Sequence, residues 1–565
     1  MIRDNERSEC FSSLTCILVN HNYVNEVQTV TQMFFPGCGF NFVYKTGDTP
    51  SNHLGFEEGH GLQAGRETFA SLIVPNAGRE TFASLIVPNA GRETFASPTV
   101  HNASVSHPDP ESPQVAQSDK SFHSTPLGEN VSPDRSAYAI KTYVDIHIAQ
   151  AQIIQNSQII SEYTLPVNSL PLHLSPRRVL MLALYHALQK IHPTRTPWGA
   201  LTGIRPSKMV RDWLDSGYSH EKILQTMADP FCCTPEKTKL ALLVATAEQE
   251  LTARIYNNAT NPIGVYISIP FCPTRCVYCS FNVDHKPSTK NIEELYIAKL
   301  IQEIKAKAKQ LQNLNGVISS IYIGGGTPTV LSDNLLQQLL DAVQTTFGPV
   351  PEYTVEAGRP DTLTQYKLAL LHRYGVNRIA VNPQTLSDAT LKIISRKHTS
   401  ADFFRAFALT RDAGFDCINT DIIVGLPSET PSDVRRTMEQ IAKISPENIT
   451  VHTLAVKRAS RLNAAFADYA LPDAKTTEEM LAITSKICKT TGLVPYYMYR
   501  QKNMVGMFEN VGYSKPGHEC LYNVGMMAET QTVLGIGAGA VSKFVKDGKI
   551  TREFNVKNPE IYLIR

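Results

Sequence analysis

Six apolar runs of strand length alternate with longer stretches that suit helices, and this alternation constrains the fold more than any other feature. The runs occupy residues 264–269, 318–323, 353–357, 378–382, 417–424 and 449–454, and helical stretches include 292–311, 335–346 and 432–444. Two strands joined by a helix return in the same direction, so the pattern predicts a parallel sheet. Six units rather than eight predict an α/β fold with an incomplete, TIM-like (β/α)6 barrel, in which chemistry gathers at the carboxyl ends of the strands.

A perfect repeat lies upstream of this region. The string AGRETFASLIVPN begins at Ala64, recurs at Ala77 and starts again at Ala90, so its period is 13 residues. This period matches none of the usual solenoid units. Each copy carries Gly and Pro, and a Pro- and Ser-rich run follows, which predicts a disordered insertion at 47–135. A short stack of β-arcs is the alternative.

The segments on either side of the insertion predict a small α+β accessory domain that precedes the barrel. Residues 136–255 begin with alternation at 143–148, which suits a half-buried strand, and continue with helical patterns at 179–191 and near 234–255. We expect residues 1–46 to be the N-terminal segment of this accessory domain, 256–545 the barrel, and 546–565 a C-terminal tail. A helical start near Pro559 ends abruptly at Arg565, which is typical of a truncated helix or a fragment.

Composition limits the classes of partner. Lys and Arg total 54 and Asp and Glu total 52, which gives a net charge of +2 and argues against nucleic acid or an anionic membrane attracted by bulk charge. No stretch approaches the ~20 apolar residues of a membrane span, and no apolar core follows a basic start. We therefore expect a cytoplasmic protein. Its eleven cysteines, an odd number, do not indicate a disulfide framework.

Three of the cysteines fall in one short stretch directly after the first barrel strand. Cys272, Cys276 and Cys279 are spaced by four and three residues, so one loop can wrap three thiolates around a single centre. Thiolates are ligands of both iron–sulfur clusters and zinc. Zinc would need a fourth ligand such as His285, whereas a four-iron cluster can leave one iron for an exchangeable ligand. The spacing alone leaves both open.

Polar residues mark the ends of the next strands. The second strand ends in three glycines, 324–326, whose backbone can approach a ligand without obstruction by side chains. The third ends in Glu356, the fourth leads to Gln384, and the fifth presents Asp421. A carboxylate or amide in a barrel mouth is costly unless a polar partner meets it. An internal structural pair explains any one of them, but the set of three favours a polar ligand.

Together these motifs resemble those of radical S-adenosylmethionine (SAM) enzymes. Within that superfamily the chain is similar to the oxygen-independent coproporphyrinogen III oxidase family, and most closely to its HemZ-type coproporphyrinogen dehydrogenase branch. The strings that carry the resemblance, besides CxxxCxxC and GGGTP, are TVEAGRP at 354–360, NPQT at 382–385, RKHT at 396–399, DIIVGLP at 421–427, VHTLAVKR at 451–458 and GIGAGAVSK at 535–543. The resemblance covers about residues 137–560.

The resemblance implies two cofactors, a [4Fe-4S] cluster and SAM, and assigns residues to them. Cys272, Cys276 and Cys279 match the cluster ligands. Positions that touch a first SAM match Tyr266, Gly325, Gly326, Thr327, Glu356 and Val541, of which Tyr266 and Glu356 are the expected catalytic residues. Positions that line a second SAM site match Tyr278, Gln384, Arg396, Asp421 and Ala455.

The activity that the resemblance implies is oxidative decarboxylation of propionate side chains to vinyl groups in porphyrin and haem biosynthesis. A radical derived from SAM abstracts hydrogen from the propionate, which then loses carbon dioxide. The implied partners are a tetrapyrrole substrate such as coproporphyrinogen III and a low-potential electron donor such as flavodoxin or ferredoxin. The late aromatic stretch at 495–500, with Tyr513, would wall a flat tetrapyrrole pocket or pack beneath the barrel.

One departure from the family pattern keeps a second function open. The oxidases have a fourth Cys two residues after the motif, where this chain has Phe281. Related proteins without that Cys resemble haem chaperones of the same fold, which bind and deliver haem. Candidate haem ligands are His398, His452 and His518. For the oxidase, the candidates to pair with substrate propionates are Arg359, Lys457, Arg458 and Arg461.

Overall fold

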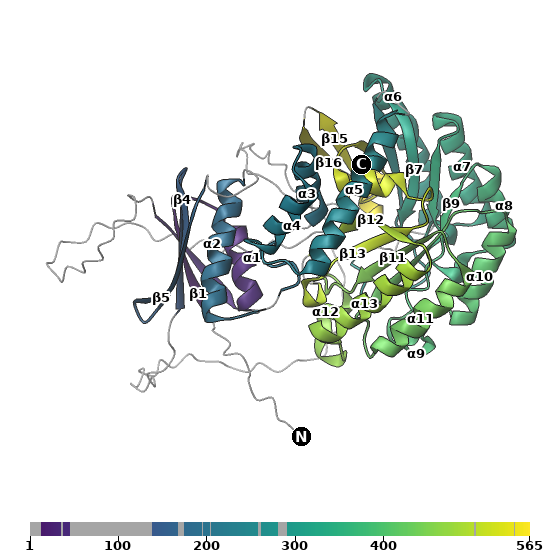
Figure 1. Ribbon diagram of the computed structural model, residues 1–565. Coiled ribbons are helices and arrows are strands. Elements are labelled where there is room, and N and C mark those ends of the chain that lie inside the picture. Colours follow the sequence, from purple (N-terminus) through teal and green to yellow (C-terminus); the bar gives the residue numbers. More distant parts are fainter. Residues whose placement is uncertain are drawn as a thin grey trace, which may run out of the picture.

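The computed structural model describes residues 13–35, 38–45, 138–167, 174–194, 196–203, 205–257, 261–280, 291–501, 504–546 and 548–565 (Figure 1). The predicted insertion at 47–135 lies outside the described residues, as do Phe281 and His285. The described residues form one sheet of five strands and one of eleven. None of the helices described is long and apolar enough to cross a membrane.

The five-stranded sheet combines residues from both sides of the insertion. Its order is β2-β1-β3-β4-β5; β1 pairs in parallel with β2 and β3, and the remaining pairs are antiparallel. Helices α1 and α2 lie along one face of this sheet (Figure 1). The bounds are β1 Ser13–Val19, α1 Val24–Phe34, β2 Gly39–Lys45, β3 Tyr138–Val144, β4 Ile148–Gln155, β5 Gln158–Pro166 and α2 Pro176–Ile191.

The strand predicted at 143–148 is wrong. β3 ends at Val144 and β4 begins at Ile148, with a tight turn between them. The carboxylate of Asp145 accepts hydrogen bonds from the backbone N–H groups of His147 at 2.7 Å and Ile148 at 2.8 Å, a common use of Asp in turns. Apolar and polar residues happen to alternate through the turn, so the pattern concealed it.

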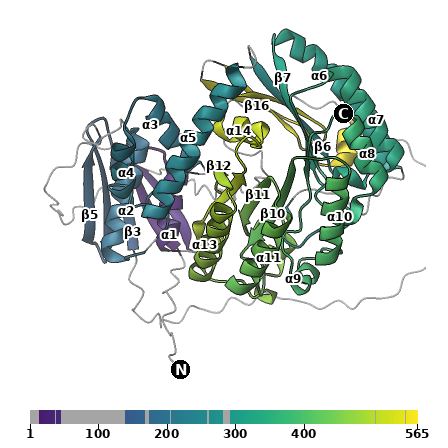
Figure 2. The ribbon, with the colours of Figure 1, turned by 45° about the vertical axis from the view of Figure 1, so that its right-hand side comes forward.

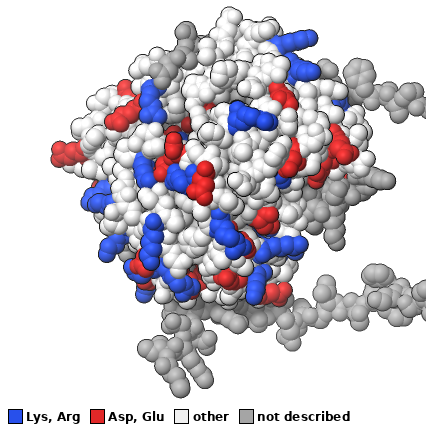
Figure 3. Space-filling view, turned by 90° about the vertical axis from the view of Figure 1, so that its right-hand side faces the viewer, with Lys and Arg blue, Asp and Glu red and all other residues white. Residues whose placement is uncertain are grey.

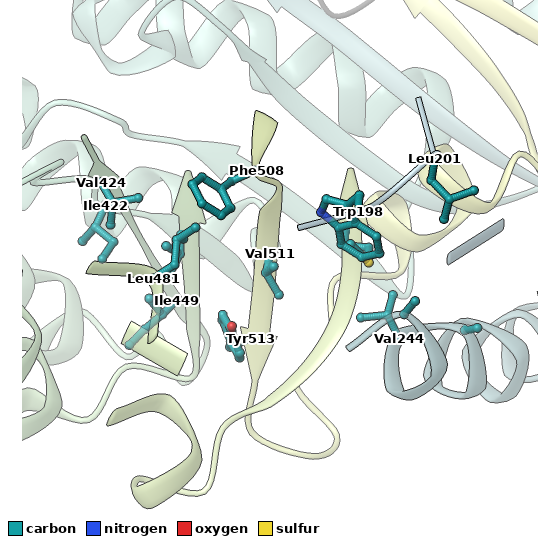
Figure 4. Packing of buried hydrophobic residues seen from close by; sticks show 14 of the residues in the cluster. Trp198, Leu201, Val244, Ile422, Val424, Ile449, Leu481, Phe508, Val511 and Tyr513 are labelled. Carbon is teal, nitrogen blue, oxygen red and sulfur yellow. The ribbon is translucent and has the colours of Figure 1, made fainter. Parts of the chain in front are cut away.

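Three helices connect the small sheet to the large one, namely α3 Pro206–Asp215, α4 His220–Ala228 and α5 Pro235–Asn257. Trp198 is fully buried, and its Nε1 donates to Glu509 at 2.8 Å, while Lys237 pairs with the same carboxylate at 2.5 Å. One hydrophobic cluster joins Trp198 and Val244 to Val511 of the large sheet (Figure 4). These contacts attach the helices to the barrel.

The large sheet contains the six predicted parallel strands in chain order, from β6 to β11. It remains open, so the barrel is incomplete (Figure 2). The strands are β6 Pro262–Ile269, β7 Val317–Gly325, β8 Glu352–Glu356, β9 Arg378–Ala380, β10 Ile418–Val424 and β11 Asn448–Thr453. The helices among and after them are α6 Ile292–Asn313, α7 Asp333–Phe347, α8 Gln365–Arg373, α9 Asp388–Ile393, α10 Ser400–Asp412, α11 Pro431–Ile444, α12 Arg461–Ala464 and α13 Ala474–Thr490, with short 3-10 turns at Pro328–Val330, Pro360–Thr362, Phe466–Asp468 and Val505–Met507.

Local sequence explains why these elements begin where they do. Nearly every residue of β6 is buried, as expected for a parallel strand covered on both faces. Reciprocal capping boxes start two of the outer helices: Thr399 with Asp402 at α10, and Thr430 with Asp433 at α11. Such caps start each helix at a defined residue, which fixes the length of the loop that precedes it.

Five further strands extend the sheet beyond the predicted six. They are β12 Val494–Tyr499, β13 Asn510–Ser514, β14 Thr532–Ile536, β15 Val541–Lys546 and β16 Lys549–Phe554, with helices α14 Leu521–Ala528 and α15 Pro559–Ile564. β13 and β12 continue antiparallel after β11, whereas β14 lies parallel to β6. Residues 546–565, predicted as a tail, therefore include β16 and α15, and Tyr562 donates to Glu303 of α6 at 2.6 Å.

Candidate functional site

The loop that follows β6 carries the three cysteines, and we call residues 270–280 the cluster loop. Its backbone is bonded to two later segments of the barrel. The Val277 N–H donates to the Ile394 carbonyl at 3.2 Å, and the Leu462 N–H donates to the Val277 carbonyl at 2.8 Å. The cluster loop is therefore held by its own backbone at the carboxyl end of the sheet.

The three thiols share one environment. Burial raises the pKa of the Cys272 thiol to about 12, and the charges of Cys279 and Cys276 act in the same direction. The Thr327 hydroxyl lies 3.3 Å from the Cys272 sulfur. Such a thiol stays protonated at neutral pH unless a metal ion displaces its proton. Among the described residues, no three His, Cys, Asp or Glu side chains lie close enough together to hold a single metal ion.

Three cationic side chains flank these thiols. Arg359 Nη1 lies 3.7 Å from the Cys276 sulfur. Lys457 interacts electrostatically with Cys279, and Arg396 with Cys276. Positive charge compensates thiolates that are taken out of water, and the charge around an iron–sulfur cluster tunes its potential. The donor set and its surroundings thus fit a cluster held by three cysteines.

The glycine-rich end of β7 lies against the cluster loop. The Gly326 N–H donates to the Ile269 carbonyl at 2.7 Å, and the Thr327 N–H donates to the Phe271 carbonyl at 2.8 Å. A Cβ at Gly326 would come within 2.4 Å of the Phe271 oxygen, so only glycine fits. Gly325, with φ of 103°, occupies a conformation that favours glycine. Part of the glycine requirement therefore comes from the cluster loop itself.

Glu356, the last residue of β8, accepts a hydrogen bond from the Tyr322 hydroxyl of β7 at 2.5 Å. Burial raises the pKa of Glu356 to about 7, and the charge of Asp421 contributes. Tyr266 of β6 stacks with Tyr322 at 6.2 Å between ring centroids, and Tyr522 stacks with both rings. Burial and the Glu356 charge raise the pKa of Tyr266. The two expected catalytic residues thus lie on either side of Tyr322, in one half-buried cluster.

Asp421 of β10 is the second acid of this interior. Its carboxylate accepts hydrogen bonds from Asn382 at 2.9 Å and Asn419 at 2.7 Å, and it lies 3.6 Å from His452. Burial raises the pKa of Asp421, but the interactions with His452 and Asn419 more than offset it and leave the pKa below its usual value. Glu356 and Asp421 thus have pKa values shifted in opposite directions, a pattern found in sites that hold and move protons.

Arg396 is buried and bonded within the protein. Its Nη2 donates to the Gly358 and Asn382 carbonyls, each at 2.7 Å, and its Nη1 lies 3.4 Å from the Tyr278 hydroxyl. His398 lies beside the guanidinium and is only 2% exposed. Burial and the Arg396 charge lower the pKa of His398 to about 3, so this imidazole is neutral. Arg396 fixes the backbone that follows β8 and β9.

The remaining predicted SAM contacts lie after three other strands. Gln384 adopts φ of 67°, its N–H donates to the Asp421 carbonyl at 3.0 Å, and its Oε1 is buried without a partner among the described residues. Ala455 follows β11 and bridges to Met504. Val541 begins β15, after the turn that follows β14. All of the predicted SAM contacts are therefore carried by strands of the large sheet or by the segments beside them.

Two predicted ligand candidates have other roles. His518 lies at the opposite end, because its carbonyl accepts from Arg378 and Asn448 at the starts of β9 and β11. Arg359, expected to face substrate carboxylates, is 3% exposed and pairs with Asp361 at 3.2 Å. The structure thus separates His518 from the cysteines and directs Arg359 toward them.

Sequence reasoning singled out Tyr266 and the aromatic stretch at 495–500 but missed two further tyrosines of the same cluster, Tyr322 and Tyr522. The predicted aromatic stretch forms β12, and its tyrosines pack in one cluster with Tyr522, Tyr266 and Tyr322. Tyr322 stands in a buried run of β7, where an isolated Tyr is read as core. The signal that could have identified Tyr322 is its hydroxyl, two positions before the glycine-rich strand end.

A basic pocket opens beside the cluster loop. Its volume is about 580 Å³, and its lining residues are Pro273, Thr274, Arg275, Lys392, Ser395, Arg396, Lys397 and Arg461. Three of these residues lie in the cluster loop between Cys272 and Cys276. Lys392 belongs to α9, residues 395–397 follow it, and Arg461 begins α12. The basic pocket therefore adjoins the backbone that carries two of the thiols.

Comparisons with known proteins identify the superfamily and the family of this chain. The model of the Radical SAM superfamily matches residues 266–441. The oxygen-independent coproporphyrinogen-III oxidase-like protein HemZ of Bacillus subtilis is 38% identical over 370 residues, which are 65% of this chain and 74% of that protein. The heme chaperone HemW of Bacillus subtilis is 32% identical over 288 residues, 49% of this chain and 69% of that protein. The solved coproporphyrinogen III oxidase HemN of Escherichia coli, described as a radical SAM enzyme, aligns with a TM-score of 0.41 and 23% identity over 53% of this chain and 67% of that one.

An open parallel barrel with CxxxCxxC after its first strand, together with the family match, defines a radical SAM protein. The cofactors of this class are a [4Fe-4S] cluster and SAM. Within the superfamily, the chain belongs to the family of oxygen-independent coproporphyrinogen-III oxidase-like proteins that includes HemZ.

Proposed function

We propose that this chain is a radical SAM oxidoreductase that converts propionate side chains of a tetrapyrrole such as coproporphyrinogen III to vinyl groups, with loss of carbon dioxide. The observation that carries the proposal is the convergence of the cluster loop, Glu356 and Asp421 at one end of the sheet. The names of its relatives add support. The predicted cytoplasmic location belongs to the same proposal.

The chain's own residues would hold the cofactors as follows. Cys272, Cys276 and Cys279 would bind three irons of the cluster, while Arg359 and Lys457 offset the charge of the thiolates. When bound, the cluster and SAM supply a radical that abstracts hydrogen. The protein positions them and keeps water away from the reacting atoms.

The first SAM would lie along the inner surface of β6 to β8. Its contacts would be Tyr266, Gly325, Gly326, Thr327 and Glu356, with Val541 from β15. The Glu356 carboxylate, held by Tyr322, would accept hydrogen bonds from the polar groups of SAM. A positive ligand group beside Glu356 would also lower its pKa, which burial has raised to about 7.

The second SAM would lie toward β9 to β11, with Tyr278, Gln384, Arg396, Asp421 and Ala455 as contacts. The buried Gln384 Oε1 has no partner among the described residues, so it is free to accept a hydrogen bond from a ligand. Arg396 acts mainly as a positioning residue, because its Nη2 is already bonded to two carbonyls.

A haem chaperone of the same fold is the second candidate, and the named activity of the HemW relatives favours it. The positions of the three candidate haem ligands favour the oxidase instead. His398 is buried and neutral, His452 lies beside Asp421, and the His518 carbonyl is bonded at the opposite end of the sheet. A haem iron could reach His398 only if the barrel opened.

The test is anaerobic reconstitution with iron and sulfide, followed by spectroscopy of the reduced cluster with and without SAM and assay of 5′-deoxyadenosine. We expect a four-iron signal that SAM perturbs, deoxyadenosine formation with dithionite, and loss of carbon dioxide from coproporphyrinogen III. Stoichiometric haem binding without porphyrinogen turnover would favour the chaperone. A protein that binds zinc instead, or a cluster whose spectrum SAM does not change, would refute radical formation from SAM and therefore hydrogen abstraction from the substrate.

A further inference from the structure

The basic pocket carries an unusual concentration of one charge. Five of its eight lining residues are Lys or Arg, and none is Asp or Glu. The whole chain has a net charge of only +2. On the face of the barrel in Figure 3, Lys and Arg side chains are interspersed with Asp and Glu. That face carries both signs of charge, whereas the lining of the pocket carries only one.

The charges at the pocket are available to a partner. Lys392, Lys397 and Arg461 are exposed. Lys392 and Lys397 form no ion pair with any other described residue. Exposed, unneutralised cations of this kind attract an acidic surface over about a Debye length and raise the rate of its association.

The walls of the pocket are held in place by hydrogen bonds. The Thr274 hydroxyl donates to the Ser395 carbonyl at 3.2 Å, and Arg275 donates to the Ala459 carbonyl at 2.7 Å. Arg461 in turn donates to the Arg275 carbonyl. The cluster loop and both flanking segments therefore form one preorganised surface, and a partner seated there touches the backbone between two of the cysteines.

The lining also identifies the kind of partner. A tetrapyrrole ring needs apolar or aromatic walls, and a small-molecule pocket is mostly apolar. Pro273 is the only apolar residue among the eight that line the basic pocket. An acidic protein surface needs no such walls, because complementary charge steers and orients it.

We propose that the basic pocket is the docking surface for a small acidic one-electron carrier protein of the flavodoxin type. The inference rests on the proposed function, since it assigns the entry point of the electron which that function requires. One electron leaves the reduced carrier, which is oxidised by one electron, and enters the cluster, which is reduced by one electron. Lys392 and Lys397 bind and orient the carrier, and residues 273–275 separate it from the thiols.

The test compares two double variants in the reconstituted protein. Lys392→Glu with Lys397→Glu reverses both exposed charges at the pocket, and the matched control, Lys305→Glu with Lys309→Glu, reverses two exposed charges on α6. We expect the pocket variant to bind oxidised flavodoxin more weakly, with a dissociation constant raised by about tenfold or more at low salt. The difference should vanish near 1 M salt, where the Debye length is about 3 Å. The control should bind as the unmodified protein does.

A second measurement separates docking from chemistry. Dithionite reduces the cluster without a docking protein, so dithionite-driven SAM cleavage should be equal in the pocket variant and the unmodified protein, while flavodoxin-driven cleavage falls about tenfold. Equal flavodoxin affinity in all three proteins would overturn the inference, as would weakened binding of coproporphyrinogen III by the pocket variant. If the unmodified protein fails to cleave SAM with dithionite, the proposed function fails, and the binding measurement still decides the docking surface.

Discussion

Two glutamates of β8, one at each end of the large sheet, differ in how the protein compensates their charge. At the amino end, Glu352 at the start of β8 accepts two backbone N–H groups, at 2.7 and 2.8 Å, and lies 3.9 Å from Arg378. At the carboxyl end, Glu356 of the same strand forms no ion pair with any described residue and accepts from Tyr322. The charge of Glu352 is thus compensated within the fold, whereas that of Glu356 faces no described cation in an ion pair.

A further glutamate at the amino end, Glu447 just before β11, repeats the contrast with Glu356. Burial raises the pKa of Glu447, but the Ile418 N–H, Lys515 and Arg411 more than offset it and leave the pKa below its usual value. Burial raises the pKa of Glu356 to about 7. An ionised glutamate therefore stabilises the fold at position 447, near the amino end, and destabilises it at position 356, at the carboxyl end. A site that gains stability by binding cofactors is expected at the carboxyl end.

The largest effect should come from the thiols. Cys276→Ser removes one cluster ligand, so we expect loss of the iron–sulfur absorbance and a drop in SAM cleavage of about 1,000-fold or more. The melting temperature of the protein before reconstitution should change little. Cys232→Ser, at an exposed cysteine in the loop between α4 and α5, is the control and should keep the cluster. A normal iron and sulfide content in Cys276→Ser would contradict the assignment.

The amino end should respond in stability instead. Arg378→Met leaves Glu352 without its nearest cation and removes the donors to the His518 and Glu519 carbonyls. We expect a loss of about 3–5 kcal/mol in the free energy of unfolding, because an uncompensated charge remains buried. Urea unfolding measures it. Arg405→Met, at an ion pair whose arginine is 69% exposed, should cost less than about 0.5 kcal/mol; equal losses in both variants would erase the contrast.

The sequence predicted the six parallel strands because buried parallel strands read as continuous apolar runs. It did not predict β12 to β16, which are short, mostly antiparallel and carry Gly and polar residues. The turn at Asp145 was hidden for a related reason, since a hydrogen-bonded turn can preserve alternation. Element type follows from local pattern, whereas sheet edges depend on pairing between distant segments.

The site shows the same division. The cysteine spacing and the glycine-rich strand end are local, and both were recognised. The Tyr322 to Glu356 hydrogen bond joins neighbouring strands 34 residues apart. Lys392 and Lys397 meet the cluster loop only because α9 ends beside it. No period or motif in one segment encodes those contacts, so they could not be predicted from a single sequence.

Glu356 gives a pH test of the carboxyl end. Its raised pKa means that the folded state favours the neutral acid, so its contribution to stability is present below pH 4.5 and is lost as the pH rises through about 7. Before reconstitution, Glu356→Gln should match the unmodified protein at pH 4 and exceed it at pH 8 by up to about 3 kcal/mol, from 1.36 kcal/mol for each pH unit. The variant should also bind SAM more weakly.

The control for this pH test is Glu439→Gln, at an exposed position of α11, which should show no such dependence. If Glu356→Gln lowers stability at pH 8, the carboxylate is neutralised in the protein and the two ends do not differ as described.

Glu447→Gln should show the smaller and opposite dependence. Its lowered pKa means that the ionised form stabilises the fold above pH 4.5, and that this contribution is lost as the pH falls through the folded pKa. Gln can still accept from Ile418 but loses its charge toward Arg411 and Lys515, whose side chains are partly exposed and therefore screened. We expect a loss of about 1 kcal/mol at pH 7 that shrinks toward zero at acid pH, measured by urea unfolding across the pH range. A loss that persists undiminished at low pH would mean that packing, rather than charge, holds this end of the sheet.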